Sequence, residues 1–394
     1  MNTVPRLDLD PYADEALKNP YETQRTIRDA GPVVWLTKYA CYAVAGHTVV
    51  QRILQDYRQF SSAAGVGLAN LKKPGAWRAQ SPLVESDPPD HSAIRGAMNK
   101  ILSPAIIRAW RDAFAAEAAG FCDRVLAMGE FDGLHDFAFA FVQNVFPAVL
   151  GIEPNPRNFS IVGRHSANAA GPKNHLFAQS QAELESIMDW YLRSQTPEGL
   201  VPGGFGEKVF AAEQAGDMPA GTAGPVMRTL VRGGLDTTIS GVSSTLLYLA
   251  RNPPQFALLK GDPTLVLSAF EEALRLESPT NSVYRTTTDS AEIDGIKLLP
   301  NEKVLLLIGA ANRDPRVWPD ADQFRVRRRA RNALFFGGGA HNCLGQRTAR
   351  LEAECLLGEF VRRVKTLELT GEPSWQAVNA LRTLDRLPLR VSLQ

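Results

Sequence analysis

The sequence predicts one large, mainly α-helical domain with small β elements, spanning residues 1–394. Helical periodicity dominates from His91 to about Lys260, whereas β-rich stretches are short and occupy residues 33–46 and about 290–308. The chain has no internal repeat, low-complexity tract or Ser/Pro/Gly-rich linker. A second independently folding domain is therefore not expected.

Elements near the N-terminus alternate between helix and strand. A helix is predicted over residues 21–31, ended by Gly31, then a hairpin over 33–46 and a second helix over 47–60. Residues 61–89 contain several glycines and prolines, which predicts a long loop.

Three longer helices are predicted after this loop, over residues 104–128, 224–252 and 344–364. The second is about thirty residues long and mostly apolar or small, which is typical of a helix buried through the middle of a molecule. The third follows a Gly-rich loop at residues 337–339.

Charge and cysteine content exclude several classes of protein. With 43 basic and 42 acidic residues the net charge is only +1, so nothing calls for nucleic acid or an anionic membrane. No signal-peptide pattern opens the sequence, and no stretch approaches the roughly 20 apolar residues of a membrane helix. Four scattered cysteines without a CxxC pair argue against a disulfide framework or a cysteine-rich zinc site. A cytoplasmic, soluble monomer is expected.

The segment FFGGGAHNCLG holds Phe336, Gly337, Gly339, Cys343 and Gly345 just before a predicted helix. Unpaired N–H groups and the dipole at a helix N-terminus lower the pKa of a nearby thiol and can donate to its sulfur. Glycines let the backbone pass close to a large flat ligand. A Gly-rich turn with a buried cysteine is the simpler interpretation of this segment alone.

Two further motifs lie on predicted helices. Glu272 and Arg275 are three residues apart and face the same side of a helix, which by itself indicates only a surface ion pair. Residues 233–238, GGLDTT, place helix-disfavouring Gly and Thr in the middle of the central helix. This pattern suits either close helix packing or a locally opened helix that turns the Thr237 hydroxyl and the Asp236 carboxylate toward a ligand.

Four basic residues complete the pattern. His91 and Arg95 lie at i and i+4 on one helical face, Arg285 lies in SVYRTTTD, and His341 precedes the cysteine by two residues. Partly buried carboxylates of a ligand need such cationic partners.

Together these motifs resemble the cytochrome P450 family, whose haem-binding pattern F-x-x-G-x-x-x-C-x-G is matched at every fixed position. The resemblance implies haem b with Cys343 as the axial iron ligand, held in a loop that includes Phe336, Gly337 and Gly345. It implies a single triangular, mostly helical domain with the haem between the central helix and the Cys343 helix.

The resemblance also assigns the remaining motifs. His91, Arg95, Arg285 and His341 would bind the haem propionates. Thr237 would hydrogen-bond dioxygen, and Asp236 would help to bring in protons. Glu272 and Arg275 would lock the core beside the cysteine; the family's third basic partner precedes the aromatic residue of the next loop, where this chain has Gln323 before Phe324 and Arg325 after it.

The implied reaction puts one atom of dioxygen into the substrate and releases the other as water. No reductase domain is fused to the chain, so electrons are expected from NAD(P)H through a separate ferredoxin and ferredoxin reductase. Arginines in residues 323–332, with Arg347 and Arg350, could steer an acidic partner to the cysteine side of the haem. A solvated basic stretch is an equally good interpretation.

Helical spacing puts Thr229, Arg232, Gly233 and Asp236 on one face of the central helix. A buried cation at Arg232 would be costly unless it met an anion, which predicts a carboxylate-bearing substrate. The alternative is an i, i+4 ion pair between Arg232 and Asp236.

The segments SSAAGVGLANLKK, ESPTNSVYRTTT and ANRDPRVW are similar to those of bacterial family members that O-demethylate para-methoxybenzoate-type aromatic acids. Two departures are an Ala at position 64, where those relatives carry Arg, and the segment 167–172, which lacks their phenylalanines. The resemblance implies hydroxylation or O-demethylation of a small, methoxylated aromatic substrate. Its predicted pocket residues are Arg232, Thr229, Val283, Ala167 and Ala170.

Three rival functions are weaker. A peroxide-driven peroxygenase would not need Asp236 and Thr237, and a non-enzymatic haem sensor would not need the full oxygen motif. A hydrolase that uses Cys343 with His341 has poor geometry, because the two residues are only two positions apart.

Overall fold

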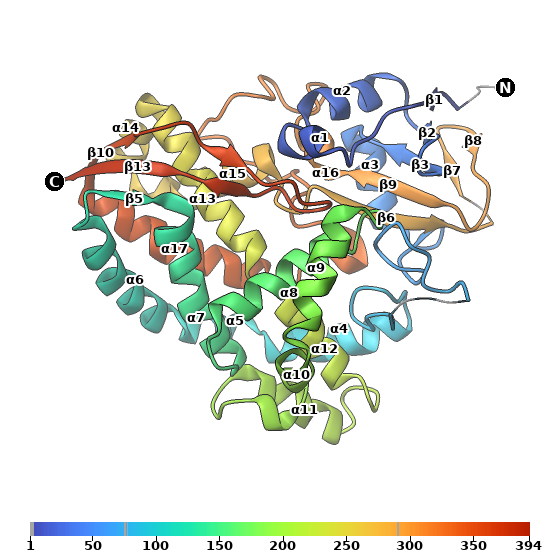
Figure 1. Ribbon diagram of the computed structural model, residues 1–394, viewed down its shortest axis with the longest axis horizontal. Helices are drawn as coiled ribbons and strands as arrows, with labels where there is room; N and C mark the ends of the chain where they lie inside the picture. Colours follow the sequence, from blue (N-terminus) through green and yellow to red (C-terminus); the bar gives the residue numbers. More distant parts are fainter. Residues whose placement is uncertain (1–3, 75, 77, 290) are drawn as a thin grey trace.

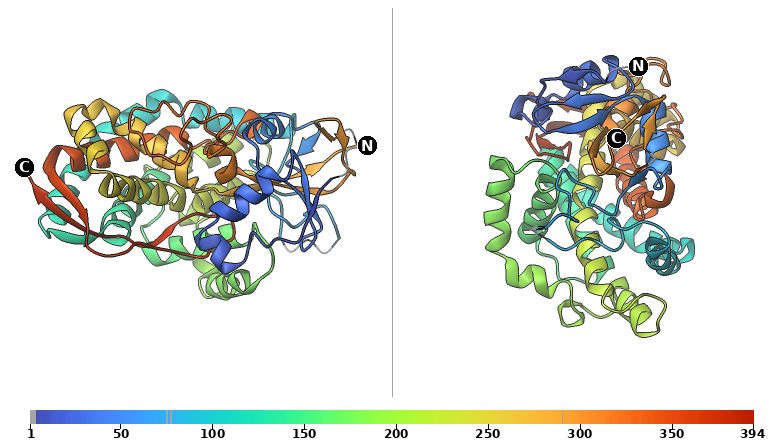
Figure 2. Two further views of the ribbon diagram at one scale, coloured as in Figure 1. Left: turned by 90° about the horizontal axis from the view of Figure 1, so that it is seen from above. Right: turned by 90° about the vertical axis from the view of Figure 1, so that its right-hand side faces the viewer.

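Helices dominate the computed structural model, which describes residues 4–74, 76, 78–289 and 291–394. A six-stranded sheet lies near the N-terminal end of the long axis and a three-stranded sheet lies near the C-terminal end (Figure 1). The two ends of the chain lie far apart along this axis, as the left-hand view of Figure 2 also shows. The expected mainly α architecture with small sheets is confirmed.

The helices of the first half begin with α1 (Asp14–Lys18), α2 (Tyr21–Asp29), α3 (His47–Gln55), α4 (Asp90–Ile101), α5 (Pro104–Ala109) and α6 (Arg111–Leu126). They continue with the π-helical segment η1 (Gly133–Phe139), α7 (Ala140–Leu150), α8 (Pro156–Asn168), α9 (His175–Glu185), α10 (Met188–Arg193) and the 3-10 turn η2 (Pro197–Gly199).

The helices of the second half are α11 (Phe205–Gln214), α12 (Ala223–Gly233), α13 (Asp236–Arg251), α14 (Pro253–Gly261), η3 (Pro263–Leu265), α15 (Val266–Glu277), α16 (Ile308–Asn312), η4 (Gly339–His341) and α17 (Gln346–Arg363).

The large sheet has the order β1-β2-β3-β9-β6-β4, from β1 (Arg6–Leu7), β2 (Val34–Leu36), β3 (Cys41–Val44), β4 (Phe60–Ser61), β6 (Ser282–Thr287) and β9 (Lys303–Leu307). The others are β10-β13-β5, β11-β12 and β7-β8, from β5 (Glu130–Asp132), β7 (Glu292–Ile293), β8 (Ile296–Lys297), β10 (Val364–Leu369), β11 (Ser374–Trp375), β12 (Leu384–Arg386) and β13 (Pro388–Leu393). The predicted hairpin is confirmed, with Val34 opposite Ala43 in antiparallel register.

Two predicted long helices are interrupted. The helix expected over 104–128 is divided into α5 and α6 at Trp110. The helix expected over 224–252 is divided into α12 and α13 at Gly234 and Leu235. A Cβ at Gly234 would overlap the ring of Phe146, so this position accepts only glycine without a shift of that ring. The opening expected around GGLDTT is therefore confirmed as a break in the central helix.

Other helices enclose the central helix and fix its place, and the central helix in turn positions the site. The helix α13 packs against α15 and η1, and α17 packs against α6 and α15. Residues of all these elements belong to the largest hydrophobic cluster of the core. Among the described residues, no helix is both long enough and apolar enough to cross a membrane.

A cavity between the central helix and the Cys343 loop

A cavity of about 360 Å³ lies between the break in the central helix and the segment that carries Cys343. Its walls include Thr229, Leu230, Gly233, Gly234, Thr237 and Thr238 from the central helix, Val283 and Arg285 from β6, and Thr348, Ala349 and Glu352 from α17. The Cys343 segment contributes Phe335, Phe336, Gly337, His341, Asn342, Cys343, Leu344 and Gly345. Most predicted site residues therefore meet in one place.

The Cys343 loop is held by local backbone contacts. The Cys343 N–H donates to the Phe336 carbonyl at 2.8 Å, which closes the loop on itself. Gly337 and Gly339 adopt φ values of 71° and 64°, a left-handed conformation that favours glycine. A Cβ at Gly339 would also lie 2.5 Å from the Leu54 carbonyl oxygen. The glycines thus set the path of the backbone around the thiol.

The protonation of Cys343 differs from the sequence-based expectation. Burial raises the pKa of the thiol, while the Gly345 N–H, the charges of Arg95 and Arg350, and the Gln346 N–H lower it. The expected donors at the start of α17 are present, but burial has the larger effect. The expected net lowering of the pKa is therefore wrong for the free thiol.

Four basic side chains gather beside the cysteine. The rings of His91 and His341 lie 4.2 Å apart, Arg95 Nη2 donates to Asn342 Oδ1 at 2.7 Å, and Arg285 Nη1 donates to the Tyr284 carbonyl at 2.9 Å. Burial lowers the pKa of Arg285 to about 10, against the opposing charge of Asp87. Burial and the charges of Arg285, His91 and Arg95 lower the pKa of His341 to about 3.

The carboxylates around this basic cluster do not pair with it directly. Among the described residues, none forms a salt bridge with its four members, although the charge of Asp87 acts on His91 and Arg285, and the buried nitrogen His91 Nε2 has no hydrogen-bond partner. Buried cations and unpaired polar atoms are costly. The cluster therefore fits a ligand that carries carboxylates.

Glu272 and Arg275 form a fully buried ion pair on α15. Arg275 Nε and Nη2 donate to the two Glu272 oxygens at 2.8 and 3.0 Å, and Arg275 also donates to the carbonyls of Asn312 and Ala321. The third basic partner is Arg328, whose Nε lies 2.8 Å from Glu272 Oε1. Gln323 contributes only a carbonyl oxygen. The third basic member of this network, which the glutamine at position 323 left undetermined, is therefore Arg328.

Asp236 and Thr237 diverge at the helix break. Thr237 lines the cavity, and its hydroxyl donates to the Gly233 carbonyl at 3.2 Å. The Asp236 carboxylate packs against α8, where a Cβ at Gly163 would overlap it. Burial raises the pKa of Asp236 to about 7, against the opposing charge of Arg164. Asp236 is thus not among the residues that line the cavity, and its burial favours the neutral carboxyl.

Glu352 is a second acidic residue with a raised pKa, and unlike Asp236 it lines the cavity. It is buried on α17, its Oε1 has no hydrogen-bond partner among the described residues, and the Thr238 hydroxyl donates a hydrogen bond to the carboxylate. Burial raises its pKa to about 8.

The part of the cavity wall formed by Thr229 is polar. Thr229 lines it, and its hydroxyl lies 2.7 Å from the Ser81 hydroxyl. Behind this pair, Arg228 Nη2 donates to the Gln80 carbonyl at 3.1 Å, and Arg228 Nε is buried without a partner among the described residues.

Arg232 lies outside the set of residues that line the cavity. Its Nε donates to Ser166 Oγ at 3.1 Å, and among the described residues it forms no salt bridge, with Asp236 or with any other carboxylate. Burial lowers its pKa, as do the charges of Arg78 and Arg228, while Tyr191 and Glu85 oppose this. The structure thus shows neither the direct projection into the cavity nor the pair with Asp236.

The other predicted pocket residues are distributed differently. Val283 lines the cavity. Ala167 lies near the end of α8, and Ala170 lies in the following turn, where its carbonyl accepts from the Leu68 N–H at 2.9 Å. Neither alanine is among the residues that line the cavity.

Comparison with known proteins decides the family. The chain is 40% identical over 392 residues to "Cytochrome p450 CYP199A2" of Rhodopseudomonas palustris, covering 99% of this chain and 95% of that protein. The chain belongs to the cytochrome P450 family. The family model "Cytochrome P450" matches residues 264–381, and the chain is 26% identical to "Biotin biosynthesis cytochrome P450" of Bacillus subtilis over 96% of this chain and 97% of that one.

Solved cytochrome P450 structures have the same fold. The structure of CYP109Q5 from Chondromyces apiculatus is 27% identical, with a TM-score of 0.81 over 98% of this chain and 99% of that chain. That of CYP109E1 from Bacillus megaterium is 23% identical, with a TM-score of 0.83 over 96% and 99%. The protein is a cytochrome P450 monooxygenase, a class that carries haem with a cysteine thiolate ligand.

The residues of this cytochrome P450 fit a haem. The cavity offers one thiol at its wall, glycines in the adjoining loop and, beside the thiol, a cluster of four basic side chains without a salt-bridged carboxylate, which suits a ligand with two carboxylates. Sequence reasoning missed Arg328, Ser81, Arg228 and Glu352. Arg328 lies in the basic stretch 323–332, and Arg228 directly precedes Thr229 in the sequence. Only contacts between distant segments distinguish these two arginines from their neighbours.

Proposed function

We propose that this cytochrome P450 hydroxylates or O-demethylates a small, methoxylated aromatic acid. The observation that carries the proposal is the Thr229 hydroxyl at the cavity wall, which lies 2.7 Å from the buried Ser81 hydroxyl, while Arg228 bonds to the Gln80 carbonyl next to Ser81. Hydroxyl groups backed by positive charge suit a carboxylate. The remaining wall is largely apolar, with Leu230, Val283 and Phe146 among its residues, and suits an aromatic ring.

Net positive charge at this end supports an anionic substrate. The charges of Arg78 and Arg228 both act on Arg232, and Glu85 is the carboxylate that opposes them. Glu85 is already engaged, because both of its oxygens accept from Arg78. An excess of buried guanidinium charge is relieved when an anion enters. Arg232 thus acts from behind the wall, and the Thr229 hydroxyl, which donates to the Pro225 carbonyl in this structure, turns to donate to the carboxylate when the substrate binds.

The same proposal assigns the remaining site residues. Cys343 would hold the haem iron through its sulfur, and His91, Arg95, Arg285 and His341 would bind the propionates. When bound, the haem supplies the reductive activation of dioxygen, so that one atom enters the substrate and the other leaves as water. The Thr237 hydroxyl, which lines the cavity, would donate a hydrogen bond to the oxidant there.

Asp236 delivers protons from the α8 side. Its pKa of about 7 lets the carboxyl both take up and release a proton at neutral pH. Electrons come from NAD(P)H through a reductase and a ferredoxin. The exposed residues Arg327, Arg329, Arg331 and Arg347 lie on the segments that flank the cysteine loop, where an acidic ferredoxin would dock.

Binding of acids and neutral analogues tests the substrate proposal. Methoxylated benzoic acids and their methyl esters are titrated into the haem-loaded wild type, Thr229→Val and Arg228→Leu, with the haem spin state as the readout. The wild type is expected to prefer the acid. Loss of one charge-assisted hydrogen bond of about 1.5–3 kcal/mol weakens acid binding by about ten- to a hundredfold and leaves ester binding nearly unchanged.

Thr26→Val is the matched control, because Thr26 is an exposed threonine of α2 whose hydroxyl also donates to a carbonyl four residues back, as that of Thr229 does. A wild type that binds esters as tightly as acids would overturn the aromatic-acid proposal. Product formation with hydrogen peroxide but not with NAD(P)H and a ferredoxin system would overturn the proposed electron supply.

A further inference from the structure

A lysine is buried in the large sheet without a directly paired carboxylate. Lys303 begins β9 and has 6% of its surface exposed. Among the described residues, no carboxylate forms a salt bridge with it. Burial lowers its pKa to about 7, and the charges of Arg285 and Arg78 act in the same direction, against that of Glu85. Because a buried ammonium group costs stability, its hydrogen bonds indicate what it contributes.

The ammonium group of Lys303 holds the loop between β4 and α4. Its Nζ donates to the Gly65 carbonyl at 2.7 Å and to the Ala64 carbonyl at 3.0 Å. Gly65 has a φ of 95°, a left-handed conformation that favours glycine. This turn brings two successive carbonyls to one ammonium group, and the Leu71 N–H also donates to the Ala64 carbonyl at 2.9 Å. Lys303 therefore fixes the backbone of residues 64 and 65.

The next residue of this loop belongs to the wall of the central cavity. Val66 follows Gly65 and lines the cavity. Its carbonyl accepts from the Tyr284 N–H of β6 at 3.0 Å, so the loop continues along the edge of the large sheet beyond β4. A shift of the Gly65 carbonyl moves Val66 as well, because both belong to one planar peptide unit. The hydrogen bonds of Lys303 are thus coupled to the shape of the cavity.

Glu85 is a second buried charge that holds the same loop. Its Oε1 accepts from the Val66 N–H at 3.3 Å, and its Oε2 accepts from the Ser81 N–H at 2.8 Å. Ser81 in turn bonds to Thr229 of the cavity wall. The loop beside the cavity is therefore fixed by an anion at Val66 and Ser81 and by a cation at the two residues before Val66.

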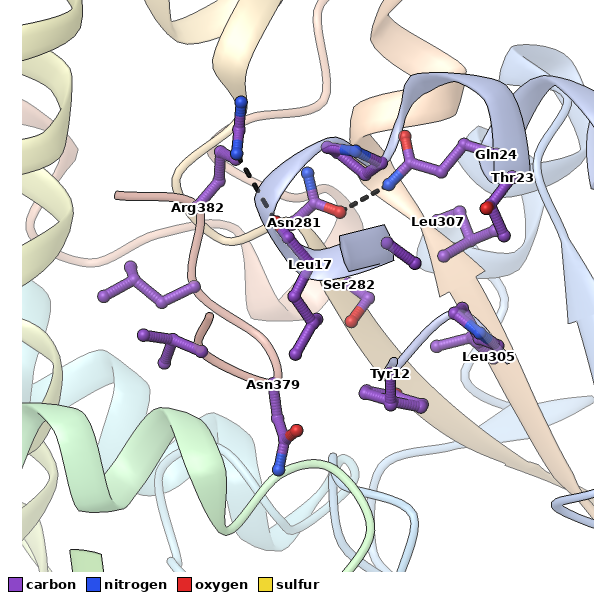
Figure 3. A pocket seen from close by; sticks show the side chains of 15 residues that line it. Tyr12, Leu17, Thr23, Gln24, Asn281, Ser282, Leu305, Leu307, Asn379 and Arg382 are labelled. Atoms are coloured by element: carbon purple, nitrogen blue, oxygen red, sulfur yellow. Dashed lines mark hydrogen bonds between the residues drawn. The ribbon is translucent and has the colours of Figure 1, made fainter. Parts of the chain in front are cut away.

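Lys303 reaches the loop from the face of the sheet that is turned away from the cavity. Side chains alternate along a strand, so Lys303 shares one face of β9 with Leu305 and Leu307. Figure 3 shows these two leucines in a crevice that is separate from the cavity. Val283 lines the cavity and lies opposite Leu306, on the other face. Lys303 is not among the residues that line the cavity, so it acts on a ligand there through the backbone of the loop.

We propose that Lys303 is a positioning residue for substrate recognition. Through the carbonyls of Ala64 and Gly65 it fixes the segment that presents Val66 to the substrate. The substrate then meets a preformed wall and does not have to order the loop when it binds, which favours affinity. This role is the same for an acidic and a neutral substrate, so the inference does not depend on the proposed function.

The test compares Lys303→Met with wild type in the haem-loaded enzyme, since methionine keeps the length of the side chain and removes the ammonium group. A methoxylated benzoic acid, its methyl ester and phenylimidazole are titrated, and the haem spectrum is the readout. Phenylimidazole needs only the haem iron and room for a ring, so it tests the inference even if neither benzoate compound binds. Each of the three is expected to bind about tenfold more weakly, whereas imidazole alone binds equally well.

Two further measurements separate positioning from a general loss of structure. With a substrate that turns over, KM should rise about tenfold and kcat should stay within about twofold, because the Cys343 loop and Thr237 are untouched. The amides of Leu71 and Tyr284, which donate to the loop carbonyls, should exchange faster with solvent. The thermal midpoint should change little, since removal of a buried charge offsets the lost hydrogen bonds.

Lys303→Arg is the conservative variant. Its guanidinium keeps the charge and can donate to both carbonyls, so affinities should return to within about threefold of wild type. Lys260→Met is the matched control, because Lys260 of α14 also donates to a carbonyl of a distant segment, that of Lys365 at 3.0 Å, but in an exposed position. It should leave every affinity unchanged.

Equal affinities in wild type and Lys303→Met contradict the inference, as does an equal loss in Lys260→Met. A Lys303→Met protein with a much lower thermal midpoint and no recovery in Lys303→Arg would show a purely structural lysine. If Lys303→Met does not fold, Lys303→Gln, which also lacks the charge, takes its place in every measurement.

Discussion

Removal of the Glu272 charge is the sharpest test of the packing beneath the cavity. Glu272 is fully buried and accepts from Arg275 Nε, Arg275 Nη2, Arg328 Nε and the Arg325 N–H, at distances between 2.8 and 3.2 Å. The substitution Glu272→Gln keeps the shape of the side chain. It leaves a fully buried guanidinium at Arg275 and a largely buried one at Arg328 without a carboxylate.

Breaking a buried ion pair on one side costs about 3–5 kcal/mol of the free energy of unfolding. The carbonyls of Asn312 and Ala321 still accept from Arg275, which favours the lower end of this range. Unfolding entropy is about 2.1 cal/mol/K per residue, so for this chain each kcal/mol lowers Tm by about 1 °C. We expect Glu272→Gln to lower Tm by about 3–4 °C.

Thermal unfolding followed by circular dichroism measures this shift, and haem retention is read in the same samples. Glu271→Gln is the control, because Glu271 is the preceding residue of α15 and pairs with Arg350 at 2.8 Å in a half-exposed position. An ion pair of that kind contributes about 0–1 kcal/mol, so its loss should shift Tm by about 1 °C or less. Equal shifts for both variants would refute the assignment of the buried charge as the source of stability.

Three further outcomes follow from the site. Cys343→His should lose the red-shifted carbon monoxide band of thiolate-ligated haem, and Cys122→Ser should keep it; a retained band in the first variant contradicts the ligand assignment. Thr237→Ala should still bind substrate and consume NAD(P)H but release mostly hydrogen peroxide, which a peroxide assay against product yield measures. Burial raises the pKa of Asp236 from 3.8 to about 7, so its contribution to the free energy of unfolding is full below 3.8 and is lost as pH rises toward 7. Asp236→Asn should therefore lose less stability than wild type between about pH 5 and pH 7 in denaturant titrations, and it should turn over more slowly; identical pH profiles would argue against an isolated, buried carboxyl.

The sequence by itself determined the mainly α class, the strands of the hairpin and the loop of Cys343. These are local properties. A hydrophobic period, a turn glycine with positive φ such as Gly337, and a cysteine directly before a helix depend on residues close together in the chain. The fixed spacing of a ten-residue motif can therefore be recognised in the sequence before the fold is known.

Helix continuity was only partly determined in this way. The break at Gly234 lies where the GGLDTT pattern placed it, and the ring of Phe146 from α7, which a Cβ there would overlap, adds a tertiary reason for the glycine. The division at Trp110 had no clear signal in the helical periodicity.

Tertiary structure alone decided which charges meet. Arg328, and not Gln323 or Arg325, gives its side chain to Glu272, because the loop of residues 319–328 turns back over α15. The spacing put Arg232 and Asp236 on one helix face with Thr229 and Gly233, which line the cavity, but Arg232 donates to Ser166 of α8, and Asp236 packs against Gly163 of the same helix. Spacing gives the side of a helix on which a residue lies, whereas the direction and pKa of a charged side chain depend on neighbours brought together from distant parts of the chain.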